Sequence, residues 1–278
     1  MTVWTFCLLV GGTSLAAGFL GALTGLGGGV VLVPVLTLFF HVDLRYALGA
    51  SLVSVIATSS GAAAAYVREG YSNIRIGMFL EIATTIGALV GAHLALVSSQ
   101  AAIAIVFGVV LLYSAYHASR PRAADATLDR PDPLATRLRL NGVYPTPDGP
   151  ARYFVRRVPA GFGLMFLAGT LSALLGIGSG AVKVLAMDRA MQMPFKVSTT
   201  TSNFMIGVTA AASAGVYLAS GYIDPGITMP VMLGVLAGSL IGTRVLVHAS
   251  VGRLRTVFAV VIAVLGVEML AKGALGHL

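Results

Sequence analysis

The chain has 278 residues, of which 57% are hydrophobic and only 10% are charged. In soluble domains about a quarter of the residues are charged, so this composition argues against a soluble protein and for one whose main solvent is lipid. The formal net charge of +8 lies in short loops and one central segment. Because it lacks the aromatic interleaving of a nucleic-acid-binding face, no nucleic-acid partner is expected.

The apolar segments form two sets of five, on either side of a polar stretch. A helix needs roughly 20 apolar residues to cross a bilayer core of about 30 Å, and most segments approach that length. The second segment of each set is about half as long. The segments cover residues 3–24, 30–40, 46–67, 74–97, 101–118, 159–175, 181–191, 197–219, 226–247 and 254–271. We therefore predict an all-α polytopic membrane protein, with residues 1–118 and 159–278 as its transmembrane halves.

The two halves are related in sequence, because residues 18–95 align with residues 169–246 without a gap. Glycines and tyrosines recur at matching positions. Gly25, Gly27, Gly29, Tyr66 and Tyr71 align with Gly176, Gly178, Gly180, Tyr217 and Tyr222. The halves are thus predicted to be one structural unit written twice.

Positive charge predicts the orientation of the halves, since Lys and Arg in short loops stay cytoplasmic. In the first half the loop after the third segment carries Arg68 and Arg75, whereas in the second half the loop after the fourth segment carries Arg253 and Arg255. This exchange predicts two inverted repeats, with both termini outside and the central segment in the cytoplasm. The exceptions to the pattern are Arg45 and Lys272.

The central segment, residues 119–158, is the polar part of the chain. It begins with prolines and then alternates around turn signals at Asn141-Gly142 and Asp148-Gly149, which predicts a small cytoplasmic β-hairpin. Two roles remain open: a lid, or a linker whose arginines hold the topology or contact anionic lipid.

Two glycine clusters, residues 25–29 and 176–180, are the main candidate site. Each glycine costs a helix about 1 kcal/mol relative to alanine, and unwound backbone in a membrane must be buried in protein or line a watery cavity. Each cluster is therefore predicted to break a helix and to start a short one, whose free N–H groups and positive dipole end suit an anion. The candidate binding residues are Gly27, Gly28, Gly29, Gly178, Ser179 and Gly180.

Close helix packing is the alternative role for glycine in a membrane protein. We favour it for the glycines outside the clusters, namely Gly18, Gly87, Gly91, Gly238 and Gly242.

Lys183 lies in the short segment after the second cluster, where the first half has Leu32. A lysine within a membrane is costly and points to function, so we expect its ammonium to attract the anion. The alternative is a lysine that reaches from a short helix to the surface. The nearest following acidic residue is Asp188, close to the expected cytoplasmic end.

The third segment of each half carries polar candidates. Ser51 and Ser202 occupy equivalent repeat positions, and Asn203 places an amide in a spanning segment. Hydroxyl and amide donors suit sulfonate or carboxylate oxygens, so all three are candidate substrate ligands, although serine also bonds to its own helix.

Other chemistry has weaker support in the sequence. Glu81, His93 and Glu268 are candidates for a coupled proton, each within reach of a membrane boundary. Cys7 is the only cysteine, and the histidines are scattered, which argues against a disulfide or a metal site. Without a recognisable catalytic or ATP-binding motif, we expect no enzymatic activity and no cofactor, so transport must draw on a gradient or the membrane potential.

Four runs resemble the sulfite exporter TauE/SafE family, also called TSUP. They are GFLGALTGLGGGVVLVP (residues 18–34), ALGAS (47–51), GIGSGAVK (176–183) and STTTSNFMIG (198–207). The resemblance covers nearly all of both halves and departs from the family pattern at Ser179, usually a glycine, and at Leu185, where the first copy has Pro34. It implies an inner-membrane transporter of sulfite or of C2 sulfonates such as sulfoacetate, with export as the commonest assignment.

The membrane potential favours the same direction, because it drives anion exit by about 2.3 kcal/mol per charge per 100 mV. We therefore expect a secondary transporter with alternating access, whose partners are a small anion and the lipid bilayer. A passive anion channel and a non-transporting membrane scaffold remain alternatives. The sequence leaves open the anion, the direction, the coupling ion and the oligomeric state, a homodimer included.

Overall fold

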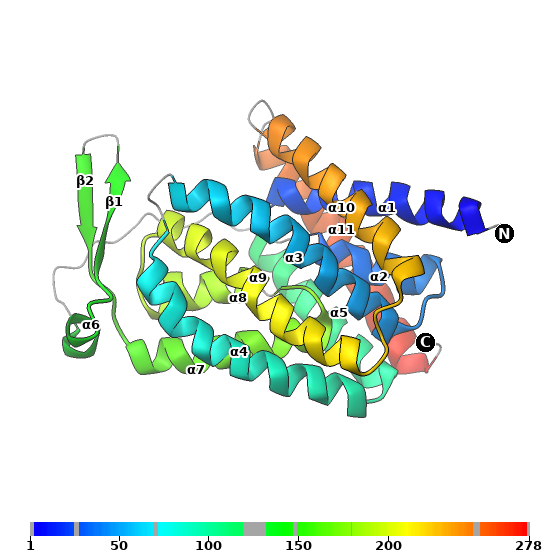
Figure 1. Ribbon diagram of the computed structural model, residues 1–278, viewed down its shortest axis with the longest axis horizontal. Helices are drawn as coiled ribbons and strands as arrows, with labels where there is room; N and C mark the ends of the chain where they lie inside the picture. The colour runs from blue at the N-terminus through cyan, green and yellow to red at the C-terminus, as the bar shows by residue number, and fades with distance from the viewer. Residues whose placement is uncertain are drawn as a thin grey trace.

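The computed structural model describes residues 3–24, 28–68, 72–118, 132–146, 149–178, 180–246 and 251–276. Within these ranges the chain forms long helices that run mostly along one axis, with a β-hairpin at one end and both termini towards the other (Figure 1). Five of these helices are long and apolar enough to cross a membrane by length and composition. The predicted all-α polytopic architecture is confirmed.

The helices of the first half are α1 (Val3–Thr24), α2 (Gly29–Phe39), α3 (Leu44–Arg68), α4 (Ile74–Val97) and α5 (Gln100–Ala118). Those of the second half are α7 (Val158–Leu175), α8 (Gly180–Leu185), α9 (Phe195–Ala219), α10 (Pro225–Leu246) and α11 (Val251–Leu275). A π-helical turn, Ala186–Ala190, continues α8. The half-length second helix of each set, α2 and α8, is where the sequence predicts it.

A small module connects the halves. It comprises α6 (Pro133–Arg137) and the antiparallel strands β1 (Gly142–Thr146) and β2 (Gly149–Tyr153), a hairpin where the sequence analysis expects one. Helix α6 is too short for a periodic pattern in the sequence to predict it. It starts at Pro133 because the Asp132 side chain accepts a hydrogen bond from the Leu134 amide and because proline suits the first turn of a helix.

The module is anchored to the start of α4. The Asn73 side chain donates to the Tyr153 hydroxyl at 2.7 Å and to the Leu140 carbonyl at 3.0 Å. Burial raises the pKa of the Tyr153 phenol to about 12, so the hydroxyl stays protonated at neutral pH. A backbone bond from Arg156 to Met191, 3.0 Å long, joins the segment after β2 to the segment after the π-helical turn.

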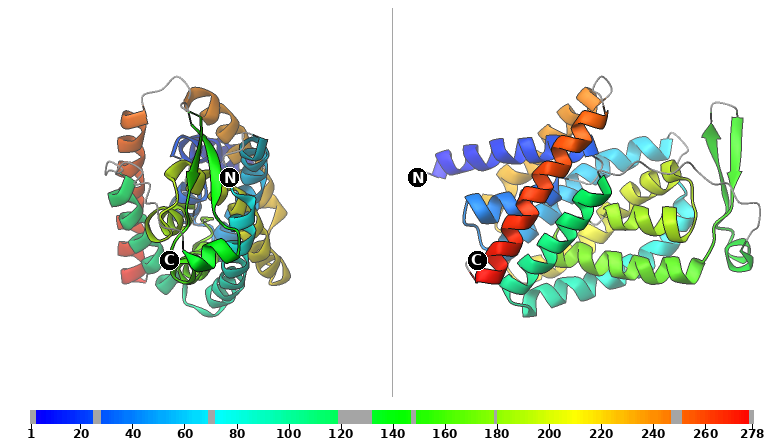
Figure 2. Two further views of the ribbon diagram at one scale, coloured as in Figure 1. Left: turned by 90° about the vertical axis from the view of Figure 1, so that its left-hand side faces the viewer. Right: turned by 180° about the vertical axis from the view of Figure 1, so that it is seen from behind.

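Each of the main helix pairs joins one helix of the first half to one helix of the second half. Helix α1 packs against α10, and its repeat equivalent α7 packs against α4, the equivalent of α10; α3 pairs with α9, and α5 with α11. The last pair lies side by side in the right view of Figure 2.

Glycine permits these close contacts. A Cβ atom on Gly18 of α1 would clash with the backbone of Val235, and one on its repeat equivalent Gly169 of α7 would clash with the Thr84 carbonyl. Gly87, Gly91 and Gly238 make similar approaches. The packing role predicted for these four glycines outside the clusters (Gly18, Gly87, Gly91 and Gly238) is confirmed.

Helices α3 and α9 run in opposite directions. At the start of α3, Arg45 donates to the Tyr222 hydroxyl (3.2 Å) and to the Ser98 carbonyl (3.0 Å), so the segment after α9 lies there. At the other end of α3, the Asn73 amide donates to Thr201, which lies near the start of α9. These protein contacts also explain why Arg45 departs from the charge pattern: its guanidinium is held by backbone and tyrosine.

Candidate functional site

The second glycine cluster breaks a helix, as predicted, and the described part of the first cluster begins the short helix α2. In the second half, α7 ends at Leu175, Gly176 and Gly178 adopt left-handed φ angles of 63° and 69°, and α8 begins at Gly180. Side chains with a Cβ atom rarely adopt such angles, which explains glycine at these two positions. In the first half, α1 ends at Thr24 and α2 begins at Gly29 after the N-cap residue Gly28. Gly27 and Ser179 lie outside the described residues.

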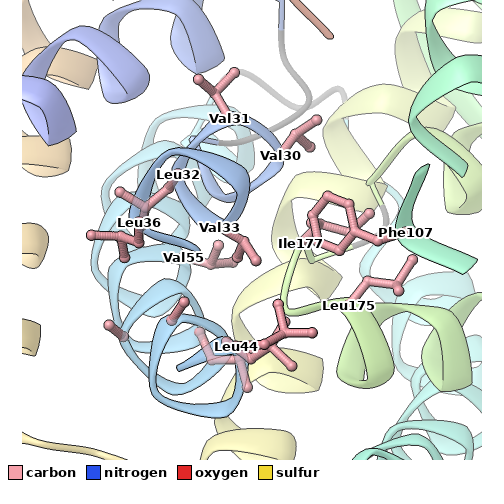
Figure 3. Close-up of a cluster of buried hydrophobic side chains, with 14 of the residues drawn as sticks. Val30, Val31, Leu32, Val33, Leu36, Leu44, Val55, Phe107, Leu175 and Ile177 are labelled. Atoms are coloured by element: carbon pink, nitrogen blue, oxygen red, sulfur yellow. The ribbon is translucent and has the colours of Figure 1, made fainter. Parts of the chain in front are cut away.

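The two breaks meet inside the protein. A Cβ atom on Gly29 would lie 2.6 Å from the Ser51 hydroxyl oxygen and 3.0 Å from the Gly176 carbonyl oxygen. Ser51 Oγ donates to that same carbonyl at 2.6 Å, so α3 of one half ties down the break of the other. Many of the side chains around the two breaks are apolar, and Ile177 and Val33 project into one buried cluster (Figure 3).

The equivalent serine makes a related bond. Ser202 Oγ of α9 donates to the Gly180 carbonyl at 3.3 Å, so both serines bond to the backbone of the second break. In this conformation their protons are engaged with carbonyl oxygens. Asn203 is half-buried, and no hydrogen bond joins its amide to another residue that the structure describes.

Lys183 lies fully inside the protein, with 0% of its surface exposed. Its Nζ donates to Thr209 Oγ1 of α9 at 2.5 Å, and Thr209 Oγ1 donates to Glu81 Oε1 of α4 at 2.6 Å. The lysine therefore has an acidic partner that is distant in sequence, linked to it through one threonine. We call these three residues the Lys–Thr–Glu network.

Glu81 is more buried than its sequence position suggests, with 8% exposure. Thr85 Oγ1 also approaches Oε1, at 3.4 Å. The second carboxyl oxygen, Oε2, is buried and accepts no hydrogen bond within the part of the chain that the structure describes. A buried polar atom without a partner is costly and calls for an explanation.

Thr209 is not among the candidate residues that the sequence suggests. Two signals point to it: it follows Ser202 by seven residues, so both lie on one face of α9 towards α8, and its repeat counterpart is Thr58. The other candidates for a coupled proton, His93 and Glu268, have exposed side chains and do not join the network.

Three curated proteins are similar to this chain over most of their length. It is 24% identical to the probable membrane transporter protein YunE of Bacillus subtilis, over 93% of this chain and 95% of the relative. It is 25% identical to the probable membrane transporter protein YdhB of the same organism, over 82% of this chain and 83% of the relative. It is also 25% identical to a probable membrane transporter protein of Methanocaldococcus jannaschii, over 91% of each chain. No solved structure matches.

These relatives and the apolar helices agree that the protein is a multi-pass membrane transporter. The family model described as sulfite exporter TauE/SafE matches residues 10–269, and the chain therefore belongs to that family.

Proposed function

We propose that the protein exports small sulfur-containing anions, sulfite or C2 sulfonates, across the inner membrane by alternating access. The observation that supports an anionic substrate is Lys183, a cation fully enclosed beside a helix break. A buried ammonium is costly unless a charge or ligand compensates it. The family description, sulfite exporter, supports a sulfur anion and outward transport.

The proposed binding region lies between the two breaks and Lys183. Gly28 and Gly29 place the start of the eleven-residue helix α2 against the second break. Helix α8 has only six residues before its π-helical turn, so its dipole contributes less than the sequence analysis expects, and Lys183 carries the larger share. Further candidates are Gly27, Gly178, Ser179, Gly180 and Asn203, with Ser51 and Ser202 as supports of the backbone.

Transport requires that the halves move relative to each other, because Lys183 is closed off from both sides in this conformation. We propose that the halves are inverted repeats, which the exchanged pairing of α1 with α10 and α7 with α4 supports. In the proposed orientation the termini lie outside, and the α6–β1–β2 module lies in the cytoplasm.

Thermal stabilisation of the purified protein by sulfite, thiosulfate, sulfoacetate, isethionate, sulfate and acetate tests this function. We expect a saturable rise of the melting temperature with at least one sulfur anion, and its loss in Lys183→Met. Lys196→Met, at an exposed lysine of α9, is the matched control and should respond like the wild type. If no sulfur anion stabilises the wild type, the proposed function is wrong.

A further inference from the structure

We propose that Glu81 binds a coupled proton and that proton and anion load together onto the Lys–Thr–Glu network. The inference rests on the proposed function and adds to it the coupling ion, the residue that carries it and the order of charges in the cycle.

Charge balance in a closed site favours loading of proton and anion together. With Glu81 ionised, the network holds one positive and one negative group, and its net charge is zero. Each uncompensated buried charge costs several kcal/mol. A monoanion alone would leave the site at −1 and a proton alone at +1, whereas both together restore zero. Loading with both ligands is therefore favoured over loading with either one.

The Glu81 carboxyl has one oxygen that can take a proton. Oε1 accepts the Thr209 hydroxyl, which itself accepts from Lys183, while Oε2 has no hydrogen-bond partner among the described residues. A proton taken from water when the site is open forms an O–H bond at Oε2 and leaves the bond to Thr209 intact. It removes the negative charge that faces Lys183, and the ammonium is then available to the anion.

The architecture of the repeat does not need these two charges. In the repeat alignment Lys183 corresponds to Leu32, Glu81 to Met232 and Thr209 to Thr58. The hydroxyl recurs, but both charged positions are apolar in the other copy, where Leu32 is fully buried. Because one copy packs without the charged pair, a role in packing alone does not explain its presence in the other.

Other titratable groups lie apart from Glu81. Within the described residues α7 has none, and α9 has Lys196 near its start and Tyr217 near its end, each remote from Thr209. The remaining groups on the surrounding elements whose side chains the structure describes are Arg75 and His93 on α4, Arg45 and Tyr46 on α3, and Asp188 and Arg189 on the π-helical turn. Lys183 is thus the charge that couples to Glu81.

One consequence concerns the driving force. A proton and a monoanion together carry no net charge, so the membrane potential does not drive their movement. An anion that accumulates in the cytoplasm then leaves down its own gradient, with one proton. Binding is reciprocal: the proton raises anion affinity by the same factor as the anion raises proton affinity.

Proton uptake on anion binding tests the inference. Sulfite, thiosulfate and isethionate are added to the purified protein in weakly buffered detergent with a pH indicator. The pH change that sulfite itself causes is measured by the same titration without protein and is subtracted. We expect uptake of about one proton per bound isethionate, which is a monoanion, and an isethionate affinity that falls about tenfold per pH unit once Glu81 is ionised.

Glu81→Gln keeps an oxygen that accepts the Thr209 hydroxyl, and its side chain is neutral like that of the protonated glutamate. We expect this variant to bind the anion at all pH values with little proton uptake, while Glu268→Gln, at an exposed carboxyl on α11, behaves like the wild type. Glu81→Asp retains a carboxyl and should retain uptake, and it replaces the glutamine variant if that one does not fold.

Anion binding without proton uptake by the wild type contradicts this inference and leaves the proposed function standing, and uptake that persists in Glu81→Gln contradicts the assignment to Glu81. If none of the three anions binds, the proposed function fails as well.

Discussion

At the scale of single residues, the central feature is a lysine and a glutamate buried together and joined by a threonine. Neither charge reaches the surface, and neither recurs in the other repeat. Such a pair adds little stability over apolar groups of similar volume, but removing one partner leaves the other uncompensated. Because the pair adds little stability, a structural role does not account for it, and we expect it to serve the function of the protein.

The repeat itself supplies the substitutions for a test. Lys183→Leu and Glu81→Met introduce the residues of the other copy, and each alone should lower the unfolding free energy by about 3–5 kcal/mol. The double variant should recover most of that loss, because no buried charge remains, yet it should no longer respond to anions. Unfolding in mixed micelles measures the stability; additive losses in the double variant contradict the coupling of the two charges.

The sequence shows only part of this network. Lys183 is recognisable because a charge stands out in an apolar half-helix, and its role in binding stays a prediction. The burial of Glu81 is not predicted, since its distance from a helix end does not reveal that α9 covers it. Thr209 resembles the other hydroxyls of α9, and only the packing of α4 and α8 against that helix distinguishes it.

At the scale of elements, two uses of glycine divide the molecule. Gly176 and Gly178 at the second break adopt backbone angles that other residues rarely reach, while the glycines within α1, α4, α7 and α10 let backbones touch. The spacing of the clusters predicts the breaks well because the backbone alone dictates them. The π-helical turn after α8 depends on contacts between segments, and α6 has too few residues for a periodic pattern, so the sequence pattern predicts neither of them.

Two glycines of α7 provide a matched pair. Gly169→Ala places a methyl group against the Thr84 carbonyl, whereas Gly163 has nothing within 4 Å of the new atom. Overpacking costs about 1–3 kcal/mol, so Gly169→Ala should be destabilised by that amount, while Gly163→Ala should be neutral or gain up to about 1 kcal/mol in helix propensity. Equal melting temperatures for the two variants contradict the proposed close contact of α4 and α7.

At the scale of the whole molecule, the hydrogen bonds define two ends. Arg45, Ser98 and Tyr222 meet at one end, and Asn73, Tyr153 and the segment after the π-helical turn gather towards the other. The loops that follow α3 and α9 are equivalent in the repeat, but they lie at opposite ends. The sequence predicts this arrangement through its arginine distribution, and the side of the membrane that each end faces stays a prediction.

Cysteine labelling in intact cells tests that orientation. Starting from a Cys7→Ser background, cysteine replaces the exposed residues Ser99, Ser220, Thr136 and Arg152 one at a time. An impermeant maleimide should label positions 99 and 220 from outside, and positions 136 and 152 only after the membrane is permeabilised. Labelling of 99 but not 220 in intact cells places the two loops on different sides and contradicts the inverted arrangement.

The most direct test of the proposed function is counterflow of labelled sulfite in proteoliposomes that contain the purified protein. A carrier with alternating access predicts saturable uptake that is accelerated by unlabelled sulfite inside the vesicles and is lost in Lys183→Met, with Lys196→Met as the matched control. Uptake that rises linearly with concentration and ignores internal sulfite identifies a channel. Equal counterflow in the Lys183→Met variant and the wild type, or no uptake by either, contradicts a sulfite carrier that works through Lys183.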